Sequence, residues 1–324
     1  MSTTTKSGIP SGKPTLRGHI SISRIDHWVK QVFVLPGIAI AITSDATGIG
    51  SGAFWKIPLG ILSVCLVSSS NYVVNEVLDA PTDLSHPIKR NRPVPSGKVN
   101  VPIAFAQWIA LGIIGVGIGF IINWQFGLTM VALWVMGCVY NIRPLRSKDQ
   151  PYLDVLSESI NNPLRMLAGW YMTGTTDLPP ASLLISYWMV GCYFMALKRY
   201  AEYRDIGDPA RAAAYRKSFA HYTLERLLVS IVFYASAAML FLGAFIMRYR
   251  LELILAFPFI ALVMAIYLGL AFKTESAVIN PEKLYREKRL MVALIVTAVL
   301  MVALMVIDMP FLDDIFKPTG LRVR

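Results

Sequence analysis

The chain has 324 residues, of which 55% are hydrophobic and 16% are charged, and its mean hydropathy is +0.53. Soluble domains carry about 25% charged residues, so these values exclude a typical water-soluble enzyme, a disordered chain and a small disulfide-rich secreted module. The net charge of +11 would suit a nucleic-acid-binding protein. However, no basic and aromatic cluster lies outside the apolar segments, so nucleic acid is not an expected partner. The composition predicts an all-α protein that crosses a membrane several times.

Nine apolar segments are long enough, or nearly long enough, to cross a bilayer, which takes about 20 residues of helix. Their approximate ranges are 28–49, 57–78, 101–123, 126–140, 153–173, 182–201, 227–247, 251–272 and 290–307. We therefore expect a nine-helix transmembrane domain at 24–310, between a flexible cytoplasmic tail at 1–23 and a C-terminal tail at 311–324.

Lysines and arginines are distributed unevenly between the two sides of these spans. The side that holds the N-terminus receives 24 of the 31 basic residues, the opposite side receives six, and Arg165 lies within a span. Because basic residues are enriched in cytoplasmic loops, this distribution predicts a cytoplasmic N-terminus in the inner membrane of a bacterium. Two loops on that side are long and mix acids with bases, which indicates a polar cavity there.

The end of the second span carries oxygen-bearing side chains four residues apart. On a continuous helix, Asn75, Asp79 and Asp83 would stack on one face with about 6 Å between neighbours. Carboxylates at this spacing repel one another unless a cation lies between them, and Mg²⁺ shared with a diphosphate is the natural occupant. Pro81 disfavours helix between the two aspartates, so Asp83 is expected on a turn. The alternative is an ordinary solvated helix end.

A second acidic pair begins the fifth span. Asp154 and Glu158 repeat the spacing of four residues, and Asn162 and Arg165 continue the polar face inward. Charged residues within a span are costly and usually face a cavity or one another. The pair is therefore a second candidate site, and the alternative is a structural salt bridge such as Glu158 with Arg165.

Basic and tyrosine side chains near these acids are candidate ligands for phosphate oxygens. The candidates are Lys30, Lys89, Arg92, Arg143, Lys148, Lys198, Arg199 and Tyr200. For Lys30 and for residues 198–200, the alternative is that they only anchor the spans at the membrane surface.

With these motifs, the sequence resembles the UbiA superfamily of intramembrane prenyltransferases over most of residues 24–230. The first motif of the family is Asn-Asp-x-x-Asp-x-x-x-Asp, and residues 75–83 match it with Glu76 in place of the first Asp. The second motif, Asp-x-x-x-Asp, is matched by Asp154 and Glu158.

Three stretches resemble one branch of the superfamily, the enzymes that transfer a phosphoribosyl group to decaprenyl phosphate. They begin at Trp28, Asp83 and Lys198, whereas residues 140–174 depart from that branch. The resemblance implies Mg²⁺-dependent transfer of a 5-phosphoribosyl group from phosphoribosyl diphosphate to a polyprenyl phosphate. A prenyl-diphosphate:aromatic-acceptor prenyltransferase is the alternative, and homo-oligomerisation is left open.

The resemblance also implies roles for individual residues. Asp79, Asp83 and Asp154 would be catalytic and, with Asn75, would hold the metal. The remaining candidates, together with Asn75, would bind substrate. These are Lys30, Lys89, Arg92, Arg143, Lys148, Glu158, Asn162, Lys198, Arg199 and Tyr200.

Overall fold

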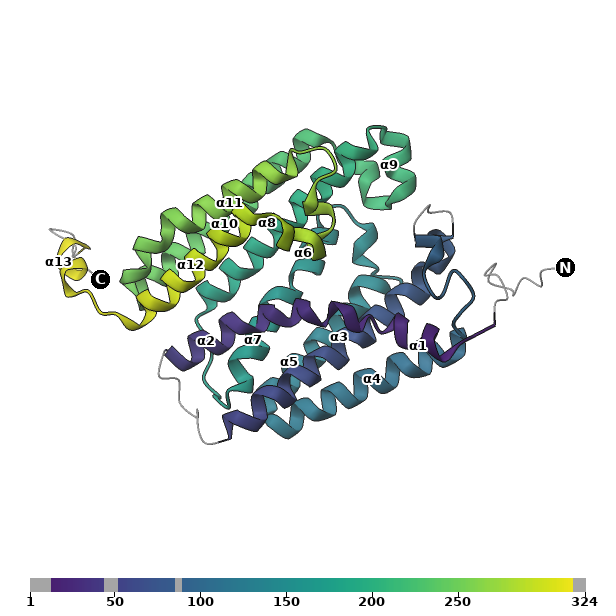
Figure 1. Cartoon of the computed structure of the whole chain (residues 1–324), viewed down its shortest axis with the longest axis horizontal. Coiled ribbons are helices and arrows are strands. Elements are labelled where there is room, and N and C mark those ends of the chain that lie inside the picture. The colour runs from purple at the N-terminus through teal and green to yellow at the C-terminus, as the bar shows by residue number, and fades with distance from the viewer. Residues whose placement is uncertain (1–12, 44–51, 85–88, 317–324) are drawn as a thin grey trace. The chain divides into compact units, whose positions relative to one another are not determined.

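The computed structural model describes residues 13–43, 52–84 and 89–316, apart from the side chains of 281–283, and in these residues it contains helices and no strand (Figure 1). The chain divides into two compact units. The first unit is Met1–Pro179 with Ala214–Ser218, and the second is Pro180–Ala213 with Phe219–Arg324.

Seven α-helices and three 3-10 helices lie within the first unit. They are α1 (Leu16–Ile22), η1 (Ile25–Val34), α2 (Leu35–Thr43), α3 (Ala53–Asp83), η2 (Lys89–Asn91), α4 (Val101–Ile122), α5 (Trp124–Asn141), η3 (Ser147–Asp149), α6 (Leu153–Ser159) and α7 (Asn161–Met172).

The long helix α3 is central to the first unit, where it packs against α4, α5 and α7 (Figure 1). Its apolar residues take part in two buried clusters, one around Val64 and Val67 and the other around Val73 and Val77. The second cluster includes Val77 and Ala80, which alternate with the polar residues of the acidic motif, so the polar end of α3 is held in place by a packed core.

Glycines allow α2 and α7 to approach closely. A Cβ on Gly37 of α2 would collide with the backbone carbonyl of Met166, and a Cβ on Gly169 of α7 would collide with that of Val34. Small residues at helix contacts are a common means of packing helices within membranes.

Two expectations from the sequence are wrong in this unit. Residues Leu16–Ile22 were expected to belong to a flexible tail, but they form α1, which Thr15 caps by accepting a hydrogen bond from the Gly18 N–H at 3.0 Å. Asp83 was expected on a turn, but α3 continues through Pro81 to Asp83. Pro81 has no N–H to donate to the Val77 carbonyl, so α3 continues to Asp83 without that hydrogen bond.

The second unit contains the C-terminal helices. They are α8 (Ala181–Ile206), α9 (Pro209–Tyr215), η4 (Lys217–His221), α10 (Leu224–Tyr249), η5 (Leu251–Ala256), α11 (Phe257–Ala271), η6 (Ala277–Ile279), η7 (Pro281–Arg286), α12 (Lys288–Val306) and α13 (Pro310–Phe316). Two of these helices are shared between the units, because residues 214 and 215 of α9 and residues 217 and 218 of η4 belong to the first unit. The last of these lies in the expected C-terminal tail, so that stretch is partly helical.

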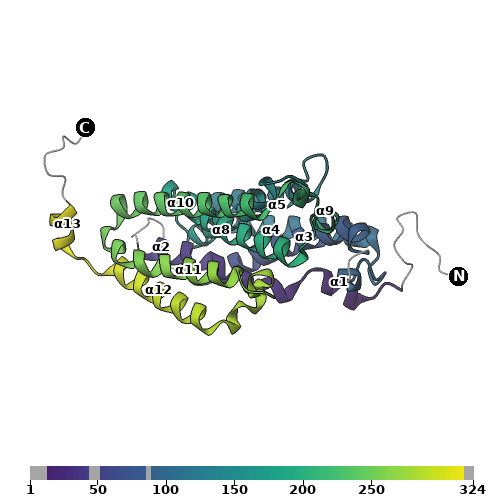
Figure 2. The same cartoon turned by 90° about the horizontal axis from the view of Figure 1, so that it is seen from above.

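Within the second unit, α8 packs along α10, and α11 packs against α8 and α12 (Figure 2). Polar side chains tie these helices together. Ser186 donates a hydrogen bond to the Ala238 carbonyl at 2.9 Å, and Tyr193 donates one to the Met264 carbonyl at 2.8 Å. Gly207 ends α8 in the left-handed conformation with φ of 68°, which glycine adopts without strain.

Among the described residues, seven helical stretches are long and apolar enough to cross a membrane. They are Leu16–Thr43, Ala53–Asp83, Val101–Ile122, Ala181–Ile206, Leu224–Tyr249, Leu251–Ala271 and Lys288–Val306. The other two predicted spans are helical as well. One is α5, and the other is divided into α6 and α7 at Ile160.

Candidate active site

The first acidic motif lies on the last turns of α3. Asp79 Oδ1 accepts hydrogen bonds from Lys148 Nζ at 2.6 Å and from Arg146 Nη2 at 2.9 Å. Asn75 Nδ2 lies 3.4 Å from Asp79 Oδ2. The carboxylate of Asp79 is therefore held by two cations, while 19% of its side chain remains exposed.

Both cations come from the loop that follows α5. Arg146 adopts a left-handed backbone with φ of 28°, and η3 begins directly after it and carries Lys148. Asn141, at the end of α5, joins the loop to α3, because its Oδ1 accepts hydrogen bonds from Asn75 Nδ2 at 2.6 Å and from Lys148 Nζ at 2.8 Å.

Lys148 is buried, with 8% of its side chain exposed. Burial lowers the pKa of Lys148 to about 8, although the adjacent carboxylate of Asp79 raises it. The ammonium group is therefore charged at neutral pH and loses its proton in mildly alkaline solution.

Asp83 and Lys89 have separate partners near the end of α3. Asp83 accepts a hydrogen bond from Arg92 Nη1 at 2.7 Å. Lys89 lies over the ring of Tyr215, with its Nζ 4.9 Å from the ring centroid.

The second acidic motif is on α6. Asp154 is fully buried, and its Oδ2 lies 3.2 Å from Ser218 Oγ and 3.5 Å from Arg216 Nη1. Glu158, one turn later, accepts a hydrogen bond from the Tyr140 hydroxyl at 2.8 Å. Arg165 donates a hydrogen bond to Gln31 Oε1 at 2.9 Å.

Asp149 connects the two motifs within the first unit. Its Oδ2 accepts a hydrogen bond from Arg146 Nε at 3.0 Å and lies 3.6 Å from Lys217 Nζ. Arg146 also binds Asp79, and Lys217 is the neighbour in sequence of Arg216 and Ser218, which contact Asp154. Ion pairs thus lead from Asp79 through Arg146 and Asp149 to Lys217, whose two sequence neighbours contact Asp154 on α6.

Several predicted site residues are not joined to this network by the contacts above. Arg143 is exposed, whereas Lys30 in η1 and Asn162 in α7 are partly buried. Lys198, Arg199 and Tyr200 belong to α8 of the second unit. Arg199 is buried and lies 3.2 Å from Glu202, and the ring of Tyr200 packs edge-on against Phe272.

Six members of the network were not among the predicted site residues. They are Asn141, Arg146, Asp149, Arg216, Lys217 and Ser218. Arg146 has the same residue type and loop as Arg143, so the sequence offered no means of choosing between them. Arg216 and Ser218 lie more than 60 positions from Asp154, and only the fold brings them together.

The donor chemistry of the first motif fits Mg²⁺. Asn75, Asp79 and Asp83 offer hard oxygen atoms, and the side chain of Asp79 is partly exposed. Within the described ranges, no group of three or more His, Cys, Asp or Glu side chains is placed to hold a metal. An ion there would therefore complete its shell with water and phosphate oxygens, which is the usual way for proteins to bind Mg²⁺.

The model of the UbiA prenyltransferase family matches residues 32–286. A decaprenyl-phosphate phosphoribosyltransferase from Mycobacterium tuberculosis is 28% identical over 227 residues, which cover 70% of this chain and 72% of that protein. The enzyme of the same name from Corynebacterium glutamicum is 30% identical over 212 residues, or 64% of this chain and 60% of the relative.

A solved structure has a similar fold. It is a UbiA homolog from Archaeoglobus fulgidus bound to GPP and Mg²⁺, with a TM-score of 0.66 and 19% identity. The match covers 89% of this chain and 98% of the other.

Proposed function

Because this chain belongs to the UbiA prenyltransferase family and is a multi-pass membrane transferase, we propose that it transfers a 5-phosphoribosyl group from phosphoribosyl diphosphate to a polyprenyl phosphate. The relatives named as decaprenyl-phosphate phosphoribosyltransferases support this choice of substrates. The observation that carries the proposal is the pairing of Asp79 with Lys148 and Arg146, because it places one carboxylate and two cations at one point.

This arrangement suits a diphosphate bound with a metal ion. In the absence of ligand, the cations neutralise the carboxylate. When the donor binds, Asp79 would turn to the metal, and Lys148 and Arg146 would turn to phosphate oxygens. Asn75 and Asp83 would complete the protein ligands of the first motif, and Asp154 those of the second. Bound Mg²⁺ would neutralise the charge that builds up on the departing pyrophosphate.

The reaction needs no general base. An oxygen of the acceptor phosphate is already an anion, and it forms a bond to C1 of the ribose. The bond between C1 and the diphosphate oxygen breaks, and pyrophosphate leaves with the electron pair. Lys148, Arg146 and Arg92 would hold the phosphates in position, so the protein contributes mainly orientation and electrostatic stabilisation.

The remaining expectations belong to the same proposal. The helices α5 and α6–α7 would complete nine spans around a polar cavity on the cytoplasmic side, with the N-terminus in the cytoplasm of a bacterium. Lys30, Lys89, Arg143, Glu158 and Asn162 would bind substrate, and so would Lys198, Arg199 and Tyr200 of α8.

The experiment uses membranes that contain the protein, phosphoribosyl diphosphate labelled in the ribose, a polyprenyl phosphate and Mg²⁺. The proposal expects a labelled lipid and one pyrophosphate released for each lipid formed. Label that stays in the aqueous phase would contradict it.

The second candidate is a prenyl-diphosphate:aromatic-acceptor prenyltransferase. It is favoured by the similarity in fold to a homolog bound to GPP and Mg²⁺, since the same acidic residues would then hold the diphosphate of an isoprenoid. Formation of a prenylated aromatic acid, without any phosphoribosylated lipid, would support this candidate over the first.

A further inference from the structure

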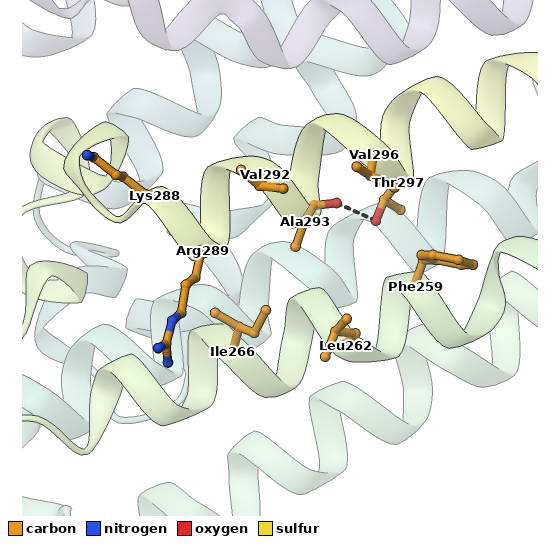
Figure 3. A pocket seen from close by; sticks show the side chains of 9 residues that line it. All are labelled: Phe259, Leu262, Ile266, Lys288, Arg289, Val292, Ala293, Val296 and Thr297. Atoms are coloured by element: carbon orange, nitrogen blue, oxygen red, sulfur yellow. Dashed lines mark hydrogen bonds between the residues drawn. The ribbon is translucent and has the colours of Figure 1, made fainter.

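A groove lies between α11 and α12 of the second unit. Its volume is about 540 Å³, and it is lined by apolar side chains such as Leu262 and Val296 (Figure 3). The hydroxyl of Thr297 also lines the groove, but it donates a hydrogen bond to the Ala293 carbonyl at 2.6 Å. The middle of the groove therefore has no unused polar side chain that would favour a polar ligand.

One end of the groove is positively charged. Lys288 and Arg289 line this end, and both side chains are exposed. In Figure 3, Arg289 extends from α12 toward α11, while the apolar residues continue along both helices. The groove thus joins two cations to an apolar channel between two helices that are long and apolar enough to cross a membrane.

The acidic residue beside these cations has another partner. Glu287 precedes Lys288 in sequence, and its carboxylate lies 4.0 Å from Lys273 Nζ. The Glu287 carboxylate is therefore paired with Lys273 and does not compete with an anionic ligand for Lys288 and Arg289. The rule that basic residues remain in the cytoplasm explains a positive loop, but it does not explain why two of its cations lie at the mouth of an apolar groove.

We propose that this groove binds an anionic glycerophospholipid of the bilayer, with its phosphate at Lys288 and Arg289 and one acyl chain between α11 and α12. The charge of the headgroup complements the two cations, and an acyl chain matches the apolar lining. Basic pockets between membrane helices commonly hold anionic headgroups in this way. None of the residues that line this groove is a residue of the proposed transferase site, so this proposal does not depend on the proposed function.

The test measures lipid that remains bound to the full-length protein. The protein is placed in nanodiscs of equal parts phosphatidylglycerol and phosphatidylcholine, released into detergent, and examined by native mass spectrometry. The unaltered protein should retain phosphatidylglycerol in preference to phosphatidylcholine. The double variant K288Q/R289Q should retain less phosphatidylglycerol, by a factor on the order of ten.

Matched variants separate the groove from general surface charge. R211Q/R286Q removes the same charge from exposed positions of the second unit that do not line the groove, and it should retain phosphatidylglycerol normally. Ala293→Phe fills the groove and should lower retention. Ala298→Phe changes an exposed position of α12 outside the groove and should not.

Three results would overturn the proposal. The first is equal retention in K288Q/R289Q and the unaltered protein, and the second is an equal loss in both charge variants. The third is displacement of phosphatidylglycerol by an equimolar polyprenyl phosphate, which would show that the groove holds the acceptor lipid instead. Size-exclusion profiles of the variants show whether they are folded.

Discussion

Lys148 and Asp79 are joined by a hydrogen bond of 2.6 Å between Nζ and Oδ1, although they are 69 positions apart in the chain. The bond connects the acidic end of α3 to the loop after α5. Asn141 accepts a second hydrogen bond from the same ammonium group, so Lys148 is held between two helices. An ammonium group can bind either a carboxylate or a phosphate, so under the proposed function Lys148 would exchange Asp79 for a phosphate oxygen of the bound donor.

The first prediction concerns the charge of Asp79. Asp79→Asn keeps the shape of the side chain but removes the negative charge that would hold the metal. We expect turnover to fall by about 10²–10³-fold or more, while the protein remains folded in detergent. Formation of labelled lipid measures the effect. Asp177→Asn removes an acid outside the network and should leave the rate nearly unchanged. Full activity of Asp79→Asn would remove Asp79 from the metal site.

The second prediction concerns pH. Burial lowers the pKa of Lys148 to about 8, so its positive charge is present below that pH and is lost as the pH rises through it. Binding of magnesium pyrophosphate should therefore weaken above pH 8, by up to about tenfold for each pH unit. Titration calorimetry between pH 7 and 9.5 measures this change.

Lys148→Arg is the matched control for this pH dependence. A guanidinium group keeps its charge throughout the range, so the variant should show a flatter profile. An equally steep loss of affinity in Lys148→Arg would mean that another group titrates.

Local patterns explain how much of the site the sequence could predict. The spacing of Asn75 and Asp79 depends only on the period of a helix, and the predicted second span does form one helix, α3. Partners of charged side chains depend on how distant segments fold. Arg143 and Arg146 were equivalent in the sequence, yet Arg146 binds Asp79 and Arg143 is exposed.

The same reasoning applies to features that the sequence predicted wrongly. The helix α1 depends on contacts with the start of α4. The His19 ring accepts a hydrogen bond at Nε2 from the Asn100 N–H, and the backbone carbonyl of His19 accepts one from Gln107 Nε2. These hydrogen bonds join residues more than 80 positions apart in the chain. The composition of this stretch, taken alone, predicted a tail. The helix α3 also includes Pro81 in its last turn. The expectation of a turn at Asp83 followed from the general rule that proline disfavours helix.

The third prediction concerns Glu76, which replaces the aspartate of the family motif. Glu76 is buried, and it accepts a hydrogen bond from the Val94 N–H at 3.1 Å and from Arg24 Nη2 at 3.3 Å. Glu76→Ala leaves both donors unpaired and should lower the free energy of unfolding by about 1–3 kcal/mol. Glu76→Gln keeps an acceptor for Val94 and should lower it less.

A thiol-reactive dye measures the unfolding of the Glu76 variants, because Cys65 and Cys192 are buried and react only when the protein opens. If Glu76→Ala melts at the temperature of the unaltered protein, the hydrogen bonds of Glu76 with Arg24 and Val94 do not stabilise the fold.

The fourth prediction concerns the close contact of α7 with the end of η1, directly before α2 begins. At Gly169, an added Cβ would overlap the backbone carbonyl of Val34, so Gly169→Ala must push the helices apart. We expect a loss of about 1–3 kcal/mol in the free energy of unfolding. Gly117 on α4 has open space where a Cβ would lie, so Gly117→Ala should be neutral or slightly stabilising, since alanine favours helix more than glycine does. The same dye measures both variants. Equal melting temperatures for the two variants would show that the close approach of Gly169 to Val34 of η1 is not required for stability.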